Sequence, residues 1–207
     1  KNAGFELRDG EIHALMGENG AGKSTLMKIL TGVYTRDAGT VVVDGQEVVY
    51  KSPQEAEKAG IVFIYQELNV LFDLTVEENL FMGKEITKAF GVCDKKAMRK
   101  KAQEVMDKMG VNIPVNAVMS DLSVGQQQMV EICKALMVDA KVLIMDEPTA
   151  ALTLPEVEEL FNIMRDLQQK GIGMIYISHR MDEINRISDR VTVMREGEYV
   201  GTVNTAD

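Results

Sequence analysis

Residues 17–24 read Gly-Glu-Asn-Gly-Ala-Gly-Lys-Ser, and this stretch decides the fold. It matches the pattern G-x-x-x-x-G-K-[ST], in which glycines allow successive backbone N–H groups to converge on a phosphate. A strand is predicted just before it, over 11–16, and a helix just after it, from about Lys23 to Leu30. The positive end of that helix would point at the same phosphate. This context indicates a phosphate-binding loop, in which Lys23 reaches the β and γ phosphates and Ser24 binds Mg²⁺.

A second motif follows the apolar run 142–145, which predicts a buried strand. Asp146 and Glu147 come directly after it, at the edge of a parallel sheet where the phosphate-binding loop also lies. An acidic pair by itself would more often be solvated or cap a helix, but together with the loop it indicates chemistry. We expect Asp146 to hold Mg²⁺ through its water shell and Glu147 to orient or deprotonate an attacking water.

Three further polar features stand at strand ends or at a helix start. Gln66 ends a predicted strand at 61–65, where its amide could contact Mg²⁺ and water. His179 ends a predicted strand at 172–177, where its imidazole could contact the γ-phosphate. The third feature begins a predicted helix 100 residues after Lys23 and reads Ser123, Val124, Gly125 and Gln126. A hydroxyl, a glycine N–H and a helix N-terminus form a phosphate-binding surface, which must serve a second phosphate site.

Strands and helices alternate along much of the chain, which predicts an α/β fold with a parallel, helix-covered sheet. Short antiparallel hairpins are predicted at 40–49, around Asp-Gly, and at 191–203. The alternation Phe5-Glu6-Leu7 predicts a further strand near the start of the chain. Helical patterns dominate the middle of the sequence: one begins with a capping box at Thr75, one runs from Asp94 to Met109, and one follows Ser123. We therefore expect one domain with a core at 1–66 and 130–207 and an inserted helical subdomain at about 67–129.

Composition narrows the classes of function. With 32 acidic and 23 basic residues the chain carries a formal charge of −9, which argues against non-specific nucleic-acid binding. Apolar runs fall far short of the roughly 18 residues that a membrane-spanning helix needs. Cys93 and Cys133 show no metal-binding spacing and are expected to be reduced thiols. The basic cluster at 95–101 is either a solvated helix face, which is favoured, or a patch that binds phosphate or a partner.

Taken in order, these motifs resemble the nucleotide-binding domain of ABC transporters over essentially the whole chain. The resemblance implies a P-loop NTPase (RecA-like) fold with an ABC-type helical subdomain. It implies ATP and Mg²⁺ as cofactors and extends the nucleotide site through Thr25. The full set expected at the nucleotide is Gly17, Glu18, Asn19, Gly20, Ala21, Gly22, Lys23, Ser24 and Thr25. It further implies metal binding by Ser24, Gln66 and Asp146, and catalysis by Glu147 with His179 and Gln66.

The resemblance also implies partners. Two such domains would pair head to tail, with ATP between the phosphate-binding loop of one and Ser123–Gln126 of the other. Residues after Gln66 and the helical subdomain would face transmembrane permease subunits, at the cytoplasmic face of the cell membrane, and no nucleic-acid partner is expected. Residues 17–28, 65–68 and 178–184 resemble the ATPases of monosaccharide importers in particular, which also work with a sugar-binding protein. These ATPases usually carry two tandem halves, of which this chain resembles the first.

The sequence departs from the family pattern at three places. Val124 stands where the signature Leu-Ser-Gly-Gly-Gln has its first glycine, which should stiffen the loop. Thr153 replaces an aspartate that would cross the dimer interface, although it can still cap its helix. The family's adenine-stacking aromatic precedes the loop by more than the 16 residues present before Gly17, so we expect the chain to begin after it. Nucleotide binding and turnover by this stretch alone should therefore be weak.

The leading hypothesis is an Mg²⁺-dependent ATPase that energises uptake of a simple sugar. One alternative is a soluble ABC-type ATPase acting on nucleic acid or ribosomes, against which the acidic charge argues. Another is an inactive nucleotide-binding module. The intact set Lys23, Ser24, Asp146, Glu147 and His179 argues against an inactive natural protein.

Overall fold

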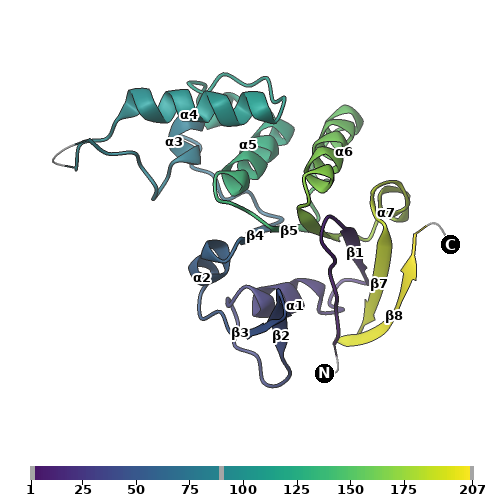
Figure 1. Ribbon diagram of the computed structural model, residues 1–207. Helices are drawn as coiled ribbons and strands as arrows, with labels where there is room; N and C mark the ends of the chain where they lie inside the picture. The colour runs from purple at the N-terminus through teal and green to yellow at the C-terminus, as the bar shows by residue number, and fades with distance from the viewer. Residues whose placement is uncertain (1–2, 89–90, 206–207) are drawn as a thin grey trace. The chain divides into compact units, whose positions relative to one another are not determined.

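The computed structural model describes residues 3–88 and 91–205, and its chain divides into two compact units (Figure 1). The sheet unit comprises Lys1–Gln66, Asp139–Pro148 and Met164–Asp207. The helical unit comprises Glu67–Val138 and Thr149–Ile163. The sequence-based boundaries at 66/67 and 129/130 stay a prediction about domain organisation.

The described part of the sheet unit is built on a six-stranded sheet in the order β4-β5-β6-β1-β7-β8. All neighbouring strands are parallel except β8, which runs antiparallel to β7. This confirms the expected α/β class with a mostly parallel sheet. The strands are β1 (Ile12–Met16), β4 (Ile61–Ile64), β5 (Val142–Asp146), β6 (Gly173–Ile177), β7 (Arg190–Arg195) and β8 (Glu198–Asn204).

Both faces of the central strands are buried, as a helix-covered parallel sheet requires. Every residue of β6 is buried. One face packs against α1 (Lys23–Leu30) and α2 (Pro53–Lys58), because Met27 and Ala56 from these helices join Leu15 and Ile175 in one apolar cluster. The sheet unit also contains the end of α6 (Leu154–Gln169) and all of α7 (Met181–Ile187).

The two predicted hairpins form. β2 (Val41–Val43) and β3 (Gln46–Val48) pair antiparallel through Asp44 and Gly45, whose φ values of 51° and 76° suit a type I′ turn. The same device joins β7 to β8 through Glu196 and Gly197, at φ 52° and 82°.

The strand predicted at Phe5-Glu6-Leu7 does not form. The side chains still alternate in exposure, because Phe5 and Leu7 are half-buried while Glu6 is exposed. The centre of the Phe5 ring lies 4.4 Å from that of the His13 ring. A strand also needs a hydrogen-bonded neighbour. Among the described residues no strand pairs with this segment, so the side-chain pattern alone gave a wrong prediction.

The helical unit holds α3 (Val76–Leu80), α4 (Lys95–Lys108), α5 (Val124–Leu136), the first part of α6 and a short 3₁₀ turn at Met119–Asp121. The predicted capping box at Thr75 forms, Ser123 completes a second one, and Asp94 accepts from the Ala97 N–H. Helical spacing in the sequence predicts a buried stripe of Met98, Ala102, Val105 and Met109 on α4. The observed stripe is Met98, Ala102 and Met106, and Val105 and Met109 are only half-buried.

The basic cluster of α4 is largely engaged inside the helical unit. Three of its members form ion pairs with acidic neighbours: Lys95 with Glu78 at 3.4 Å, Arg99 with Glu77 at 2.7 Å and Lys100 with Glu104 at 3.9 Å. This favours a solvated, ion-paired helix face over a phosphate-binding patch. None of the helices in the described ranges has the length and apolarity needed to cross a lipid bilayer.

Candidate functional site

The predicted phosphate-binding loop connects β1 to α1 and ends in two glycines with left-handed backbone. Gly20 has φ 84° and Gly22, at the N-cap of α1, has φ 95°. Glycine adopts this region without strain, unlike other L-residues. Within the described residues no side chain caps α1. The N–H groups of its first turn therefore remain available for an anion.

The position of Gly17 leaves no room for a side chain. A Cβ at this position would lie 2.4 Å from the carbonyl oxygen of Met194 in β7 and 2.9 Å from the Cβ of Ala21. The loop thus begins pressed against the neighbouring strand. A hydrogen bond from the Gly197 N–H to the Ala21 carbonyl oxygen, at 2.9 Å, attaches a later part of the loop to the β7–β8 turn.

Lys23 is held inside its own loop. The side chain is only 6% exposed, and Nζ donates to the carbonyl oxygens of Gly17 at 2.8 Å and Glu18 at 3.1 Å. These bonds satisfy an ammonium group that would otherwise be buried at a cost. They also place its charge at the start of the loop, where an incoming phosphate could replace the carbonyl partners.

Asp146 is the last residue of β5 and Glu147 follows it, so two carboxylates stand at the predicted strand end. Burial raises the pKa of Asp146, and the neighbouring Glu147 charge adds to that effect, while a hydrogen bond with Ser24 and the charge of Lys23 oppose it. A carboxylate destabilised in this way gains from a nearby cation. Ser24 and Asp146 are therefore paired across the loop in a setting that favours cation binding.

Glu147 and His179 are in direct contact, with Oε1 and Nδ1 2.9 Å apart. They come from the ends of β5 and β6, which lie side by side and parallel. The backbone of Glu147 turns sharply, with φ 48°, and its N–H donates to the Ile177 oxygen at 2.9 Å. This contact was not predicted from the sequence, because it depends on which strands are neighbours.

One cavity of about 380 Å³ in the sheet unit brings many of the predicted residues together, although His179 is not among its lining residues. The loop contributes Asn19, Gly20, Gly22, Lys23, Ser24 and Thr25, and the strand ends contribute Gln66, Asp146 and Glu147. Hydroxyl, amide and carboxylate oxygens are the donors that Mg²⁺ prefers. Over the described ranges no three His, Cys, Asp or Glu side chains form a metal-binding group by themselves. A metal here would accordingly complete its coordination with water and phosphate.

The signature residues lie in the helical unit, at the start of α5. Ser123 is the N-cap: its Oγ accepts from the Gln126 N–H at 3.2 Å, and the Gln126 side chain accepts from the Ser123 N–H at 2.9 Å. Val124 belongs to the first turn of the helix and is 44% exposed, while Gly125 is buried. The surface that would meet a second phosphate is therefore a rigid helix start.

Glu156, the last residue of the capping sequence Thr153-Leu154-Pro155-Glu156, covers this surface. Glu156 accepts from the Ser123 hydroxyl at 2.9 Å and from both the N–H and hydroxyl of Thr153 at 2.8 Å. These bonds, those from Thr153 first, lower the pKa of Glu156. A Cβ at Gly125 would fall 2.2 Å from the same side chain. The capping pattern Thr153-x-x-Glu156 predicts the bonds with Thr153 but gives no signal for the bond to Ser123.

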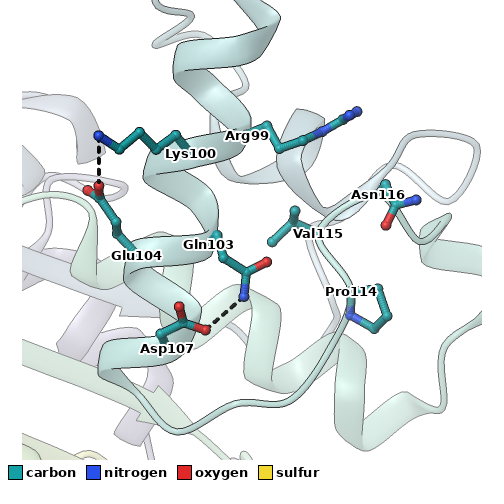
Figure 2. A pocket seen from close by; sticks show the side chains of 8 residues that line it. All are labelled: Arg99, Lys100, Gln103, Glu104, Asp107, Pro114, Val115 and Asn116. Atoms are coloured by element: carbon teal, nitrogen blue, oxygen red, sulfur yellow. Dashed lines mark hydrogen bonds and ion pairs between the residues drawn. The ribbon is translucent and has the colours of Figure 1, made fainter.

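A larger cavity, of about 580 Å³, lies in the helical unit (Figure 2). Its lining mixes both charge signs, and the charged and polar groups pair with each other: Lys100 lies 3.9 Å from Glu104, and Gln103 donates to Asp107 at 2.7 Å. A phosphate site needs donors that converge on one point, whereas the donors here are paired with carboxylates of the same lining. This cavity is larger than the one in the sheet unit, but its chemistry does not suit a nucleotide.

The fold and the strand-end site define a nucleotide-binding cassette of the P-loop class. The family model for ABC transporters matches residues 1–150. The chain therefore belongs to the ABC transporter family, as the order of motifs predicted.

Relatives and solved structures agree with this assignment. The ribose import ATP-binding protein RbsA of Bacillus licheniformis is 55% identical over 203 residues, covering 98% of this chain and 41% of that protein. The protein of the same name from Oceanobacillus iheyensis is 56% identical over 198 residues, covering 96% and 40%. The chain thus spans about two fifths of the length of the curated relatives it matches.

Among solved structures, the ADP conformation of an ATP-binding cassette of an ABC transporter matches with a TM-score of 0.85 and 30% identity, over 97% of this chain and 82% of that one. A dimeric post-hydrolysis cassette bound to ADP and Pi matches with a TM-score of 0.82 and 25% identity, over 99% and 90%. The expected fold class is confirmed.

Proposed function

We propose that this chain is the ATP-binding and ATP-hydrolysing domain of an importer that takes up a simple sugar. The single observation that carries the ATPase proposal is the cavity in which Lys23, Ser24, Gln66, Asp146 and Glu147 converge. The relatives at 55% identity, whose names specify ribose import, support the sugar.

The loop and α1 would bind the phosphates of ATP. The Lys23 ammonium would exchange the Gly17 and Glu18 carbonyls for phosphate oxygens, and the uncapped first turn of α1 would supply N–H donors. Ser24, Asp146 and Gln66 would hold Mg²⁺, which neutralises charge on the phosphate oxygens when bound.

Glu147 and His179 would act at the attacking water. The carboxylate at the end of β5 is the base or orienting group, and the bond to His179 fixes its direction. The imidazole, on the neighbouring strand end, would also face the γ-phosphate. Gln66 follows β4, which neighbours β5 on the side opposite to β6. It would link the metal to the chain segment that follows Gln66.

The proposal extends to assembly. A second nucleotide-binding domain, in a tandem half or another copy, would supply Ser123–Gln126 to this ATP, as the likeness to a dimeric cassette supports. Transmembrane permease subunits would hold the domain at the cytoplasmic face of the membrane, and a sugar-binding protein would act indirectly.

Glu147→Gln in the natural full-length polypeptide tests the catalytic part. The amide keeps the size of the side chain but cannot accept a proton, so we expect ATP to bind and turnover to fall on the order of 100-fold or more. Glu159→Gln, which removes an exposed carboxylate from α6, is the matched control. Unchanged turnover in Glu147→Gln would refute the role given to Glu147. Ribose uptake by vesicles carrying the assembled transporter tests the cargo.

A further inference from the structure

His179 lies on a short turn between β6 and α7, and a buried carboxylate lies beneath that turn. Glu183, in the first turn of α7, is 1% exposed. Its side chain is not part of the nucleotide cavity. An ionised group in this position is costly unless it is paired and hydrogen-bonded, so its partners indicate why it is there.

The partners of Glu183 surround His179 in sequence. Its Oε2 accepts from the Tyr176 hydroxyl at 2.7 Å and lies 3.5 Å from the Ser178 hydroxyl. Its Oε1 lies 2.6 Å from the Arg180 guanidinium. Ser178 also accepts from the Arg180 backbone N–H at 3.1 Å. One carboxylate thereby holds the residues before and after His179 and the strand that precedes them.

The anchor itself is rigid. Tyr176 is fully buried in the middle of the sheet, between β5 and β1. The His179 side chain, by contrast, is 57% exposed, and its Nδ1 lies 2.9 Å from Oε1 of Glu147. The direction of the imidazole is thus set mainly by the backbone turn that carries it. That turn is fixed to the sheet through Glu183.

We propose that Glu183 is a positioning residue for His179. The inference rests on the proposed function, because it assumes that His179 acts in ATP hydrolysis. Loss of the carboxylate should let the turn shift, and a displacement of about 1 Å at a reacting group can cost on the order of 100-fold in rate. The effect should appear in kcat with little change in ATP affinity, because the bonds described for Glu183 go to Tyr176, Ser178 and Arg180 and Glu183 does not line the nucleotide cavity.

The experiment compares Glu183→Gln, Tyr176→Phe and His179→Ala in the natural full-length polypeptide. Asp182→Asn is the matched control, because it removes the same charge from the adjacent, 70% exposed position of α7. ATP turnover, nucleotide affinity and thermal midpoint are measured for each variant and for the double variant Glu183→Gln/His179→Ala. We expect Glu183→Gln to lower kcat at least tenfold, Tyr176→Phe to lower it in the same direction, and Asp182→Asn to match the wild type.

The double variant separates positioning from general stability. If Glu183 acts through His179, the double variant should be no slower than His179→Ala alone. A further loss in the double variant, or a loss of nucleotide affinity in Glu183→Gln, would overturn the inference. Wild-type turnover in Glu183→Gln beside a slow His179→Ala would refute this inference alone, whereas wild-type turnover in His179→Ala would refute the proposed role of His179 as well. If Glu183→Gln does not fold, Tyr176→Phe decides, since it removes only one hydroxyl.

Discussion

Gly17→Ala should damage the nucleotide site by a steric route that the structure makes explicit. The added Cβ would lie 2.4 Å from the Met194 carbonyl oxygen, where ordinary contact begins at 3.4 Å. The obstacle is backbone in the neighbouring strand β7, which cannot rotate away like a side chain. The start of the loop must therefore move by about 1 Å, and Lys23, which donates to the Gly17 oxygen, must move with it.

Two magnitudes follow from that shift. Overpacking of this kind typically costs about 1–3 kcal/mol of the free energy of unfolding. A 1 Å displacement at the phosphates should lower ATP turnover on the order of 100-fold. The assays are urea denaturation followed by far-UV circular dichroism, since the chain contains no tryptophan, and ATP turnover by the natural full-length polypeptide.

Gly201→Ala is the control. A Cβ at Gly201 in β8 meets no atom within 4 Å, so this variant should behave like the wild type. If Gly17→Ala unfolds and turns over ATP like Gly201→Ala, the steric argument at the loop is wrong.

Two further predictions concern stability. Burial lowers the pKa of the fully buried His13, against the opposing charge of Glu11. The unfolded chain thus takes up a proton first below about pH 6.5, and the free energy of unfolding should fall by up to about 1.4 kcal/mol between pH 7.5 and 5.5. Urea denaturation at both pH values should show a smaller fall in His13→Gln, and an equal fall would contradict this. Thr75→Ala removes the cap of α3 and should cost about 0.5–2 kcal/mol in the same denaturation assay, whereas Thr87→Ala, which caps no described helix, should cost less.

Local signals predicted much of the fold. The Asp44-Gly45 turn, the caps at Thr75 and Ser123 and the loop glycines each act over a few residues, and each has a specific backbone geometry. The missing strand at Phe5–Leu7 shows the limit of such signals, because a strand depends on a partner elsewhere in the chain.

The candidate site likewise has a part that the sequence predicts and a part that it does not. Its residue types and their places at strand ends could be read from the sequence, because parallel strands end at one edge of a sheet. The contact between Glu147 and His179 could not, since it requires β5 and β6 to be neighbours. The bond between Ser123 and Glu156 and the contacts of Glu183 were not predicted for a related reason: each forms only once the helices and strands are packed.

The uncapped start of α1 makes the ligand part of the fold. Helices α2, α3 and α5 carry their own side-chain caps, at Ser52, Thr75 and Ser123, but the helix after the phosphate-binding loop leaves that place to an anion. Nucleotide binding would then stabilise the folded chain: a ligand at 100 times its Kd raises the free energy of unfolding by about 2.7 kcal/mol. The first segment to unfold without nucleotide should be α1, and hydrogen exchange in its first turn would report how full the site is.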